Sequence, residues 1–128
     1  MLFIGLSKEF SLINEDQYNT IGYFWDEMST LYGLENLQGL GYKWDKEKIY
    51  YAIGLKNGVI KDANFTIELP DNGWTIYNGK TDELKTIYNK IYLDGPLKYE
   101  IETFTNDGNC MIKYYRWFIE NEVFLWVT

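Results

Sequence analysis

The fold is decided by the sequence YEIETFT at residues 99–105, the turn NDGN at 106–109 and the run MIKYYRWFI at 111–119. These segments predict a β-hairpin with a short turn. Side chains alternate between the two faces of a strand, so Glu100, Glu102 and Phe104 share one face. That face can be open to water, or Lys113 on the next strand can neutralise a glutamate. If the face is instead covered, burial of the carboxylates is costly and indicates a functional site.

Aromatic residues are more frequent than a core of this size requires. The chain has 128 residues, which fits a single domain, 1–128, with one hydrophobic core. It contains 5 Trp, 12 Tyr and 7 Phe, together 24 aromatic residues. Tyr and Trp combine an apolar ring with a polar group, and this combination suits the lining of a ligand pocket or an interface.

The charge and the missing residue types exclude several classes of function. The net charge of −7 disfavours a surface that binds nucleic acid; it either favours cationic ligands weakly or serves solubility alone. The sequence has no His, so it lacks the commonest general base and the commonest metal ligand. With Cys110 as the single cysteine, the chain has neither a zinc-binding set nor an internal disulfide. We therefore expect no metal and no cofactor.

Neither a signal peptide nor a membrane-spanning segment is expected. The apolar run at 1–6 has no basic residue before it, and no apolar run approaches the roughly 18 residues that a transmembrane helix needs. A single cysteine also fits a reducing compartment. The sequence thus predicts a cytoplasmic protein without a membrane partner.

The predicted elements follow the order β-α-β-β twice. The expected strands lie at 3–10, 37–44, 48–55, 65–69, 74–77, 98–105 and 110–119. Of the two expected helices, the first is capped by Asn14 and ends at Gly33, and the second is capped by Thr81 and ends before Gly95. This order predicts an α+β fold of two similar halves, with one sheet or two joined half-sheets and the helices on one face.

The first predicted helix carries an aromatic stripe whose role is open. Tyr18, Phe24 and Trp25 recur at helical spacing on its apolar face. They either belong to the core or line part of a pocket. Trp25 is the better pocket candidate, because a large amphipathic ring is often left half exposed at a cleft.

Five short motifs occur in the order and at the spacing of a known family. They are IGYFW at 21–25, YGL at 32–34, YYAIGL at 50–55, ELPDNGWTIY at 68–77 and IETF at 101–104. In these motifs the chain resembles the GyrI-like small-molecule-binding family, which includes the effector-binding domains of AraC- and MerR-type multidrug regulators and stand-alone proteins. The similarity covers residues 3–119 and leaves 120–128 as an extension.

The resemblance implies an antiparallel sheet built from two β-α-β-β halves with pseudo-two-fold symmetry, and an aromatic-lined cleft between the halves. The glutamate of the family's Glu-x-aromatic motif lies in this cleft and matches Glu102, followed by Phe104, better than Glu100. No catalytic residue is assigned. The candidate ligand-binding residues are Glu102, Phe104, Trp25, Tyr51, Trp74, Tyr77, Tyr115 and Trp117.

Three kinds of function follow from these features. The first is a domain that binds an amphipathic, cationic organic ligand, for transcriptional regulation or sequestration. The second is an enzyme in which Glu102 activates water and Tyr115 or another tyrosine acts as acid, since some family members resemble hydrolases of strained electrophiles. The third is protein interaction, since other family members inhibit DNA gyrase. In that case the acidic surface or the apolar tail at 120–128 contacts a partner, or the tail contacts a second copy of the chain.

Overall fold

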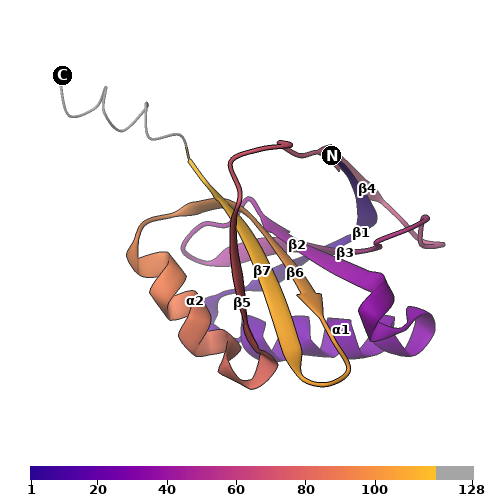
Figure 1. Ribbon diagram of the computed structural model, residues 1–128, viewed down its shortest axis with the longest axis horizontal. Coiled ribbons are helices and arrows are strands. Elements are labelled where there is room, and N and C mark those ends of the chain that lie inside the picture. The colour runs from indigo at the N-terminus through magenta and orange to yellow at the C-terminus, as the bar shows by residue number, and fades with distance from the viewer. Residues whose placement is uncertain (118–128) are drawn as a thin grey trace.

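The computed structural model describes residues 1–117, which form a seven-stranded antiparallel sheet and two α-helices (Figure 1). The strands are β1 (Leu2–Ser11), β2 (Leu37–Tyr42), β3 (Lys48–Leu55), β4 (Phe65–Glu68), β5 (Thr75–Lys80), β6 (Leu97–Phe104) and β7 (Asn109–Arg116). The helices are α1 (Gln17–Tyr32) and α2 (Leu84–Leu93). The strand order across the sheet is β4-β1-β3-β2-β6-β7-β5. The predicted α+β class and antiparallel sheet are confirmed.

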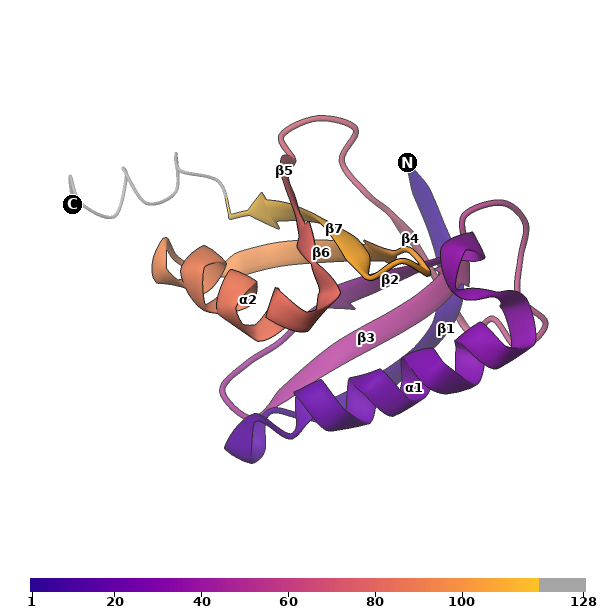
Figure 2. The same ribbon diagram turned by 60° about the horizontal axis from the view of Figure 1, so that its bottom comes forward.

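Both helices pack on the same face of the sheet, as Figure 2 shows. α1 buries Phe24, Trp25 and Met28 in a core cluster that also includes Tyr51 and Ile53 of β3. α2 adds its own buried stripe to the same cluster, consisting of Ile87, Tyr88 and Ile91. Each such apolar side chain contributes about 1.5–3 kcal/mol on burial, so these stripes hold the helices on the sheet.

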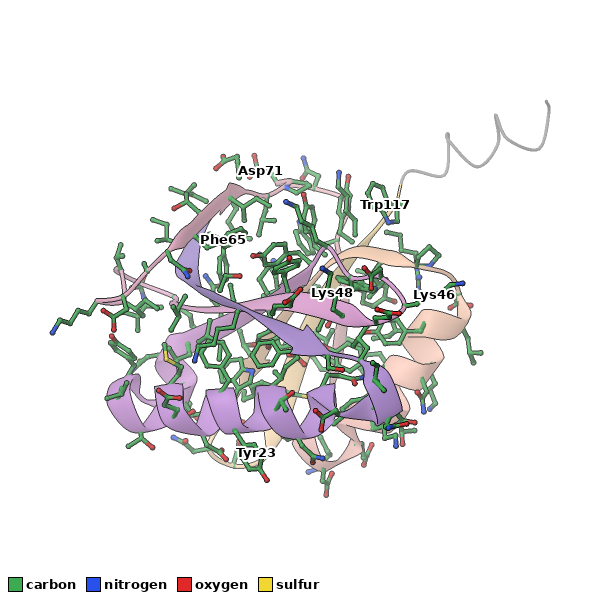
Figure 3. The ribbon with its side chains drawn as sticks, turned by 180° about the vertical axis from the view of Figure 1, so that it is seen from behind. Tyr23, Lys46, Lys48, Phe65, Asp71 and Trp117 are labelled. Atoms are coloured by element: carbon green, nitrogen blue, oxygen red, sulfur yellow. The ribbon has the colours of Figure 1, made fainter. Side chains whose placement is uncertain are left out.

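The opposite face of the sheet has a second core. Phe3, Leu40 and Ile101 are buried there, and Phe65 and Trp74 pack against them. The chain between β4 and β5 covers this core and is tied down by the N-terminus. The amino group of Met1 donates a hydrogen bond to the carbonyl of Leu69 at 2.9 Å and forms an ion pair with Asp71 at 2.7 Å. Figure 3 shows Phe65 and Asp71 on the side of the molecule away from Tyr23 of α1.

The helix ends were predicted with mixed success. Gly33 ends α1 as expected: its φ is 88°, a conformation that favours glycine. The predicted N-caps are wrong. Asn14 has a φ of 56° inside a 3₁₀ segment, and α1 begins only at Gln17. Thr81 likewise opens a 3₁₀ segment, and α2 starts at Leu84. Local turn conformations of the backbone therefore replace the expected side-chain caps.

The longest helix, α1, has 16 residues. Within residues 1–117, no helix combines the length and the apolar character that crossing a membrane requires. The predicted contact through 120–128 and the end of the expected last strand fall outside the described residues.

β1 and β3 approach each other so closely that two positions accept no side chain. A Cβ atom added to Gly54 would lie 2.1 Å from the carbonyl oxygen of Ile4, and one on Gly5 would lie 2.6 Å from that of Ile53. Both obstacles are backbone atoms, so neither can rotate away. Glycine at these positions is a condition for the central pairing of the sheet.

Gly54→Ala should therefore destabilise the protein by about 3 kcal/mol, because the two strands must separate to admit the methyl group. Gly22→Ala is the matched control. A Cβ there meets nothing within 4 Å, and alanine in a helix interior should stabilise by up to about 1 kcal/mol. Urea unfolding followed by tryptophan fluorescence measures both. Equal, small effects of the two substitutions would contradict the close approach of β1 and β3.

Candidate functional site

Glu100 and Glu102 of β6 are buried on the face of the sheet that the helices cover. Each side chain is 4% exposed, and they are the only charged residues among the buried ones of the described chain. Lys113 does not neutralise them, because it pairs with Ile101 and so lies on the opposite face. No Lys or Arg within residues 1–117 forms an ion pair with either glutamate. Of the alternatives that the sequence left open, the covered face is the correct one.

A cavity of about 1090 Å³ lies over these carboxylates and is bounded by α1, α2 and the sheet. Glu100, Glu102 and residues of the β6–β7 turn line it together with residues of both helices. Its aromatic lining consists of Tyr18, Trp25, Trp44, Tyr51, Tyr88, Tyr92 and Phe104. The site is thus an acidic pair within mostly aromatic and apolar walls.

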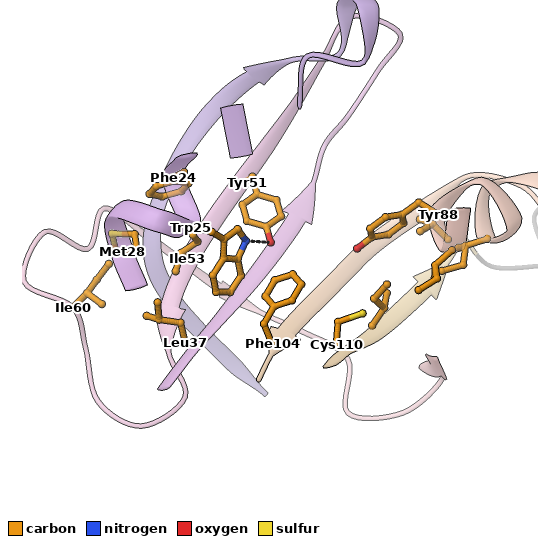
Figure 4. Close-up of a cluster of buried hydrophobic side chains, with 14 residues drawn as sticks. Phe24, Trp25, Met28, Leu37, Tyr51, Ile53, Ile60, Tyr88, Phe104 and Cys110 are labelled. Atoms are coloured by element: carbon orange, nitrogen blue, oxygen red, sulfur yellow. Dashed lines mark hydrogen bonds between the residues drawn. The ribbon is translucent and has the colours of Figure 1, made fainter. Parts of the chain in front are cut away.

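Glu102 accepts hydrogen bonds on both of its oxygens. Oε1 accepts from the hydroxyl of Tyr51, and Oε2 accepts from the hydroxyl of Tyr88 at 2.7 Å. The indole Nε1 of Trp25 donates to the Tyr51 oxygen at 2.8 Å, a bond drawn in Figure 4. An indole N–H can only donate, so the Tyr51 oxygen is its acceptor and the Tyr51 proton is directed to Glu102. Tyr51, oriented by Trp25, and Tyr88 thus place one hydroxyl donor on each oxygen of Glu102.

Glu100 has a different environment. Its Oε2 accepts a hydrogen bond from the hydroxyl of Tyr92 at 2.9 Å, whereas its Oε1 accepts none from the described residues. Tyr88 and Tyr92 are one helical turn apart, about 6 Å along α2, and Glu100 and Glu102 are separated by about 6.6 Å along β6. Because these spacings match, α2 presents one hydroxyl to each carboxylate. The two tyrosine rings stack at 5.5 Å between their centroids.

Two glycines in β2 make room for Glu100 and for the Tyr51 hydroxyl that donates to Glu102. Gly39 pairs with Glu102 and Gly41 pairs with Glu100. A Cβ at Gly39 would lie 2.0 Å from the Tyr51 hydroxyl oxygen, and a Cβ at Gly41 would lie 2.8 Å from Cγ and Oε1 of Glu100. Glycine at alternate positions of a strand is a visible signal of close approach, and our sequence interpretation missed it.

Burial dominates the electrostatics of the site. Burial, followed by the negative charge of Glu102, raises the pKa of Glu100 to about 8, although the Tyr92 hydrogen bond opposes this. Burial also raises the pKa of Glu102, opposed by the hydrogen bonds from Tyr51 and Tyr88. With two hydroxyl donors, Glu102 is the better place for a negative charge. Glu100 therefore retains its proton to a higher pH than Glu102 does.

The predicted site residues fall into two groups. Trp25, Tyr51, Phe104 and Glu102 all line the cavity, and the rings of Trp25 and Phe104 meet edge to face at 4.7 Å. Trp25 belongs to both the core and the cavity wall, so the two roles left open for it coincide.

The other predicted residues do not line this cavity. Trp74 and Tyr115 lie on the opposite face, with their ring centroids 5.5 Å apart. Tyr77 and Trp117 are exposed, by 37% and 50%. Tyr18, whose role the sequence left open, lines the cavity, and so does Glu100, which the sequence ranked below Glu102. Sequence reasoning missed the lining residues Trp44, Tyr88 and Tyr92. The signal that could have found the α2 pair is two tyrosines four residues apart on an apolar helix stripe.

No family model matches this chain, and no match is found among curated proteins or solved structures. Membership of the GyrI-like family therefore stays a prediction from the five motifs. Within residues 1–117, no three His, Cys, Asp or Glu side chains are grouped as metal ligands. Function has to be argued from the acidic pair and its cavity.

The raised pKa of Glu100 predicts how stability depends on pH. The folded protein retains a proton that the unfolded chain releases above its ordinary pKa of 4.5. Stability is thus greatest below that value and decreases as the pH rises to about 8. We expect the free energy of unfolding to fall by roughly 3–5 kcal/mol between about pH 5 and pH 8. Denaturant unfolding at a series of pH values measures this decrease.

Glu100→Gln should flatten most of that decrease, because glutamine keeps an acceptor for Tyr92 and has no proton to lose. The control is Glu27→Gln on the exposed side of α1, which should leave the pH dependence unchanged. A wild-type stability that increases from pH 5 to 8 would contradict the proposed protonation.

Proposed function

We propose that this chain is a small-molecule-binding domain that takes an amphipathic organic cation into the cavity over β6. One observation carries the proposal: Glu102 is a buried carboxylate with a hydroxyl donor on each oxygen and no Lys or Arg partner within residues 1–117. Structural glutamates that are buried usually have a cationic partner. Here that partner would be the ligand.

The walls of the cavity suit a cation with apolar surface. Seven aromatic side chains line it, and each ring face can attract a cation by about 0.5–2 kcal/mol. The volume of about 1090 Å³ lies just above the range of roughly 300–1,000 Å³ that small-molecule sites occupy. A hydrated inorganic ion would leave these rings without a partner, so an organic cation fits better.

Two further polar groups are available to a ligand. Gln17 and Thr81 line the cavity, and their Oε1 and Oγ1 atoms are buried without a hydrogen bond in the described part of the chain. Unpaired buried acceptors are costly, and a ligand with a donor group would relieve that cost. Together with Glu102, they would orient a ligand that has a polar group as well as a charge.

We further infer that the fold is a tandem β-α-β-β repeat with a pseudo-two-fold axis between β2 and β6. The strand order supports this repeat. It runs β1-β3-β2 to one side of the axis and β5-β7-β6 to the other, with β4 added at one edge. The aromatic cleft between the halves would then be the described cavity, which α1 and β3 line from one half and α2 and β6 from the other. Such a domain would serve either transcriptional regulation or sequestration of its ligand.

A matched pair of probes tests the proposed charge recognition. N-methylquinolinium and methylnaphthalene have nearly the same shape, but only the first is a cation. We expect the cation to quench tryptophan fluorescence at lower concentration, because Trp25 and Trp44 line the cavity. Glu102→Gln should weaken binding of the cation by at least about tenfold, equivalent to 1.4 kcal/mol, and should leave the neutral probe unchanged.

Glu27→Gln removes the same charge from the exposed side of α1 and is the control for long-range attraction. A thermal melt of each variant excludes loss of folding. Equal binding of the cation by the wild type and Glu102→Gln would remove Glu102 from the proposal. Failure of a broad panel of lipophilic cations to bind would contradict the function itself.

One observation favours a second candidate, hydrolysis of a reactive electrophile. Two buried acids lie side by side, each with its own tyrosine donor, and the pKa of Glu100 is raised to about 8, so such a pair can supply a general acid beside a base. In this candidate Glu102 activates water and Glu100 or a cavity tyrosine protonates the leaving group. Turnover of an electrophile that disappears in Glu102→Gln would support it, and equal turnover by the variant would exclude it.

A further inference from the structure

Glu100 has features that recognition of one positive charge does not require. It is as buried as Glu102, lines the same cavity, and lies on the same strand face about 6.6 Å away. Tyr92 occupies its Oε2, whereas its Oε1 accepts no hydrogen bond from the described residues. Gly41 lies opposite on β2 and gives the Glu100 side chain its place, since a Cβ atom there would lie 2.8 Å from Oε1. Glu100 is thus a nearly fully buried acid at the cavity, and one of its oxygens accepts no hydrogen bond from the described residues.

We propose that Glu100 and Glu102 together form a two-carboxylate site for an organic ligand that carries two cationic nitrogens, one at each carboxylate. The ligand class is then an amphipathic diamine whose nitrogens are separated by about the 6.6 Å repeat of same-face residues on a strand. This inference rests on the proposed binding function and specifies the charge of its ligand.

The pattern of hydroxyl donors supports two separate binding positions. α2 supplies one tyrosine to each carboxylate, Tyr92 to Glu100 and Tyr88 to Glu102. The two acids therefore do not share one donor or one proton through a direct hydrogen bond. Each has its own fixed orientation, as two point contacts on one rigid ligand require.

Within residues 1–117, the groups around Glu100 are all acidic or neutral. Glu102 lies beside it on β6, Tyr88 and Tyr92 approach from α2, Tyr18 from α1, and Tyr51 from β3. Without a neighbouring cation, Glu100 retains its proton near neutral pH. A second ammonium group beside it favours the ionised form, so binding of a diamine should release that proton to the solvent.

The test compares two naphthalene probes. One carries two aminomethyl groups whose nitrogens are about 6.6 Å apart, and the other carries a single aminomethyl group. Isothermal titration calorimetry near pH 7 gives both affinities, and a second buffer of different ionisation enthalpy gives the protons released. We expect the diamine to bind about tenfold tighter than the monoamine and to release up to one proton per ligand. Glu100→Gln should remove the diamine's advantage and the proton release, yet leave the monoamine within about twofold.

Controls separate this inference from the proposed function. Glu102→Gln should weaken both amines, and Glu27→Gln should weaken neither. If both amines bind the wild type equally, or Glu100→Gln keeps the diamine's advantage, the two-carboxylate site is overturned while the cation-binding function stands. If neither these amines nor N-methylquinolinium bind, the function and this inference fail together. Far-UV circular dichroism of Glu100→Gln shows that the comparison concerns a folded protein.

Discussion

The structure depends on two carboxylates that are buried side by side without a cation in the described part of the chain. Burial of a single unpaired carboxylate costs several kcal/mol unless fixed donors replace its water. Here three tyrosine hydroxyls do so, one from β3 and two from α2. The sheet supplies only one of these donors, and the hairpin supplies none of them. The acids on β6 can therefore be buried only if α2 docks over them, and the site in turn requires the acids.

The same constraint explains features that look unrelated along the sequence. β2 has glycines at alternate positions because the Tyr51 hydroxyl and the Glu100 side chain occupy the space where Cβ atoms would stand. Tyr88 and Tyr92 are one helical turn apart because the acids are two strand residues apart. Trp25 fixes the direction of the Tyr51 hydroxyl and at the same time fills the core. Without the acids, none of these residues would be required at its position. Replacement of buried charged groups by well-packed apolar residues often stabilises a protein. Their presence is an argument for function.

Most of the elements could be predicted from the sequence, because periodicity and turn residues are local signals. The hairpin, the apolar stripes of both helices and the end of α1 at Gly33 all follow from such signals. The shared face of Glu100 and Glu102 also follows from strand alternation alone. What covers that face is decided by where two helices dock, and this depends on contacts between residues far apart in sequence.

The register of the last hairpin explains why part of the candidate site was misplaced. The turn at 105–109 pairs Phe104 with Cys110, so Glu102 faces Ile112, and Tyr115 lies on the other side of the sheet. A shift of one residue would reverse the faces of every side chain on β7. Alternation within a strand gives no information on this shift, since it depends on the length of the turn. Lys113 and Tyr115 were therefore residues of the right type on the wrong face for a site over Glu102.

If the chain is a tandem repeat, the site lies where the repeat is least symmetric. β2 and β6 occupy equivalent places on either side of the proposed axis, and they pair with each other. β6 carries glutamates where its partner carries glycines. One half thus supplies the charge, and the other supplies the space that the charge requires. Each feature alone would be harmful. A side chain at Gly41 would collide with Glu100, one at Gly39 would collide with the Tyr51 hydroxyl that serves Glu102, and glycines without these groups would leave a void. A half-domain alone would therefore lack the site even if it folded.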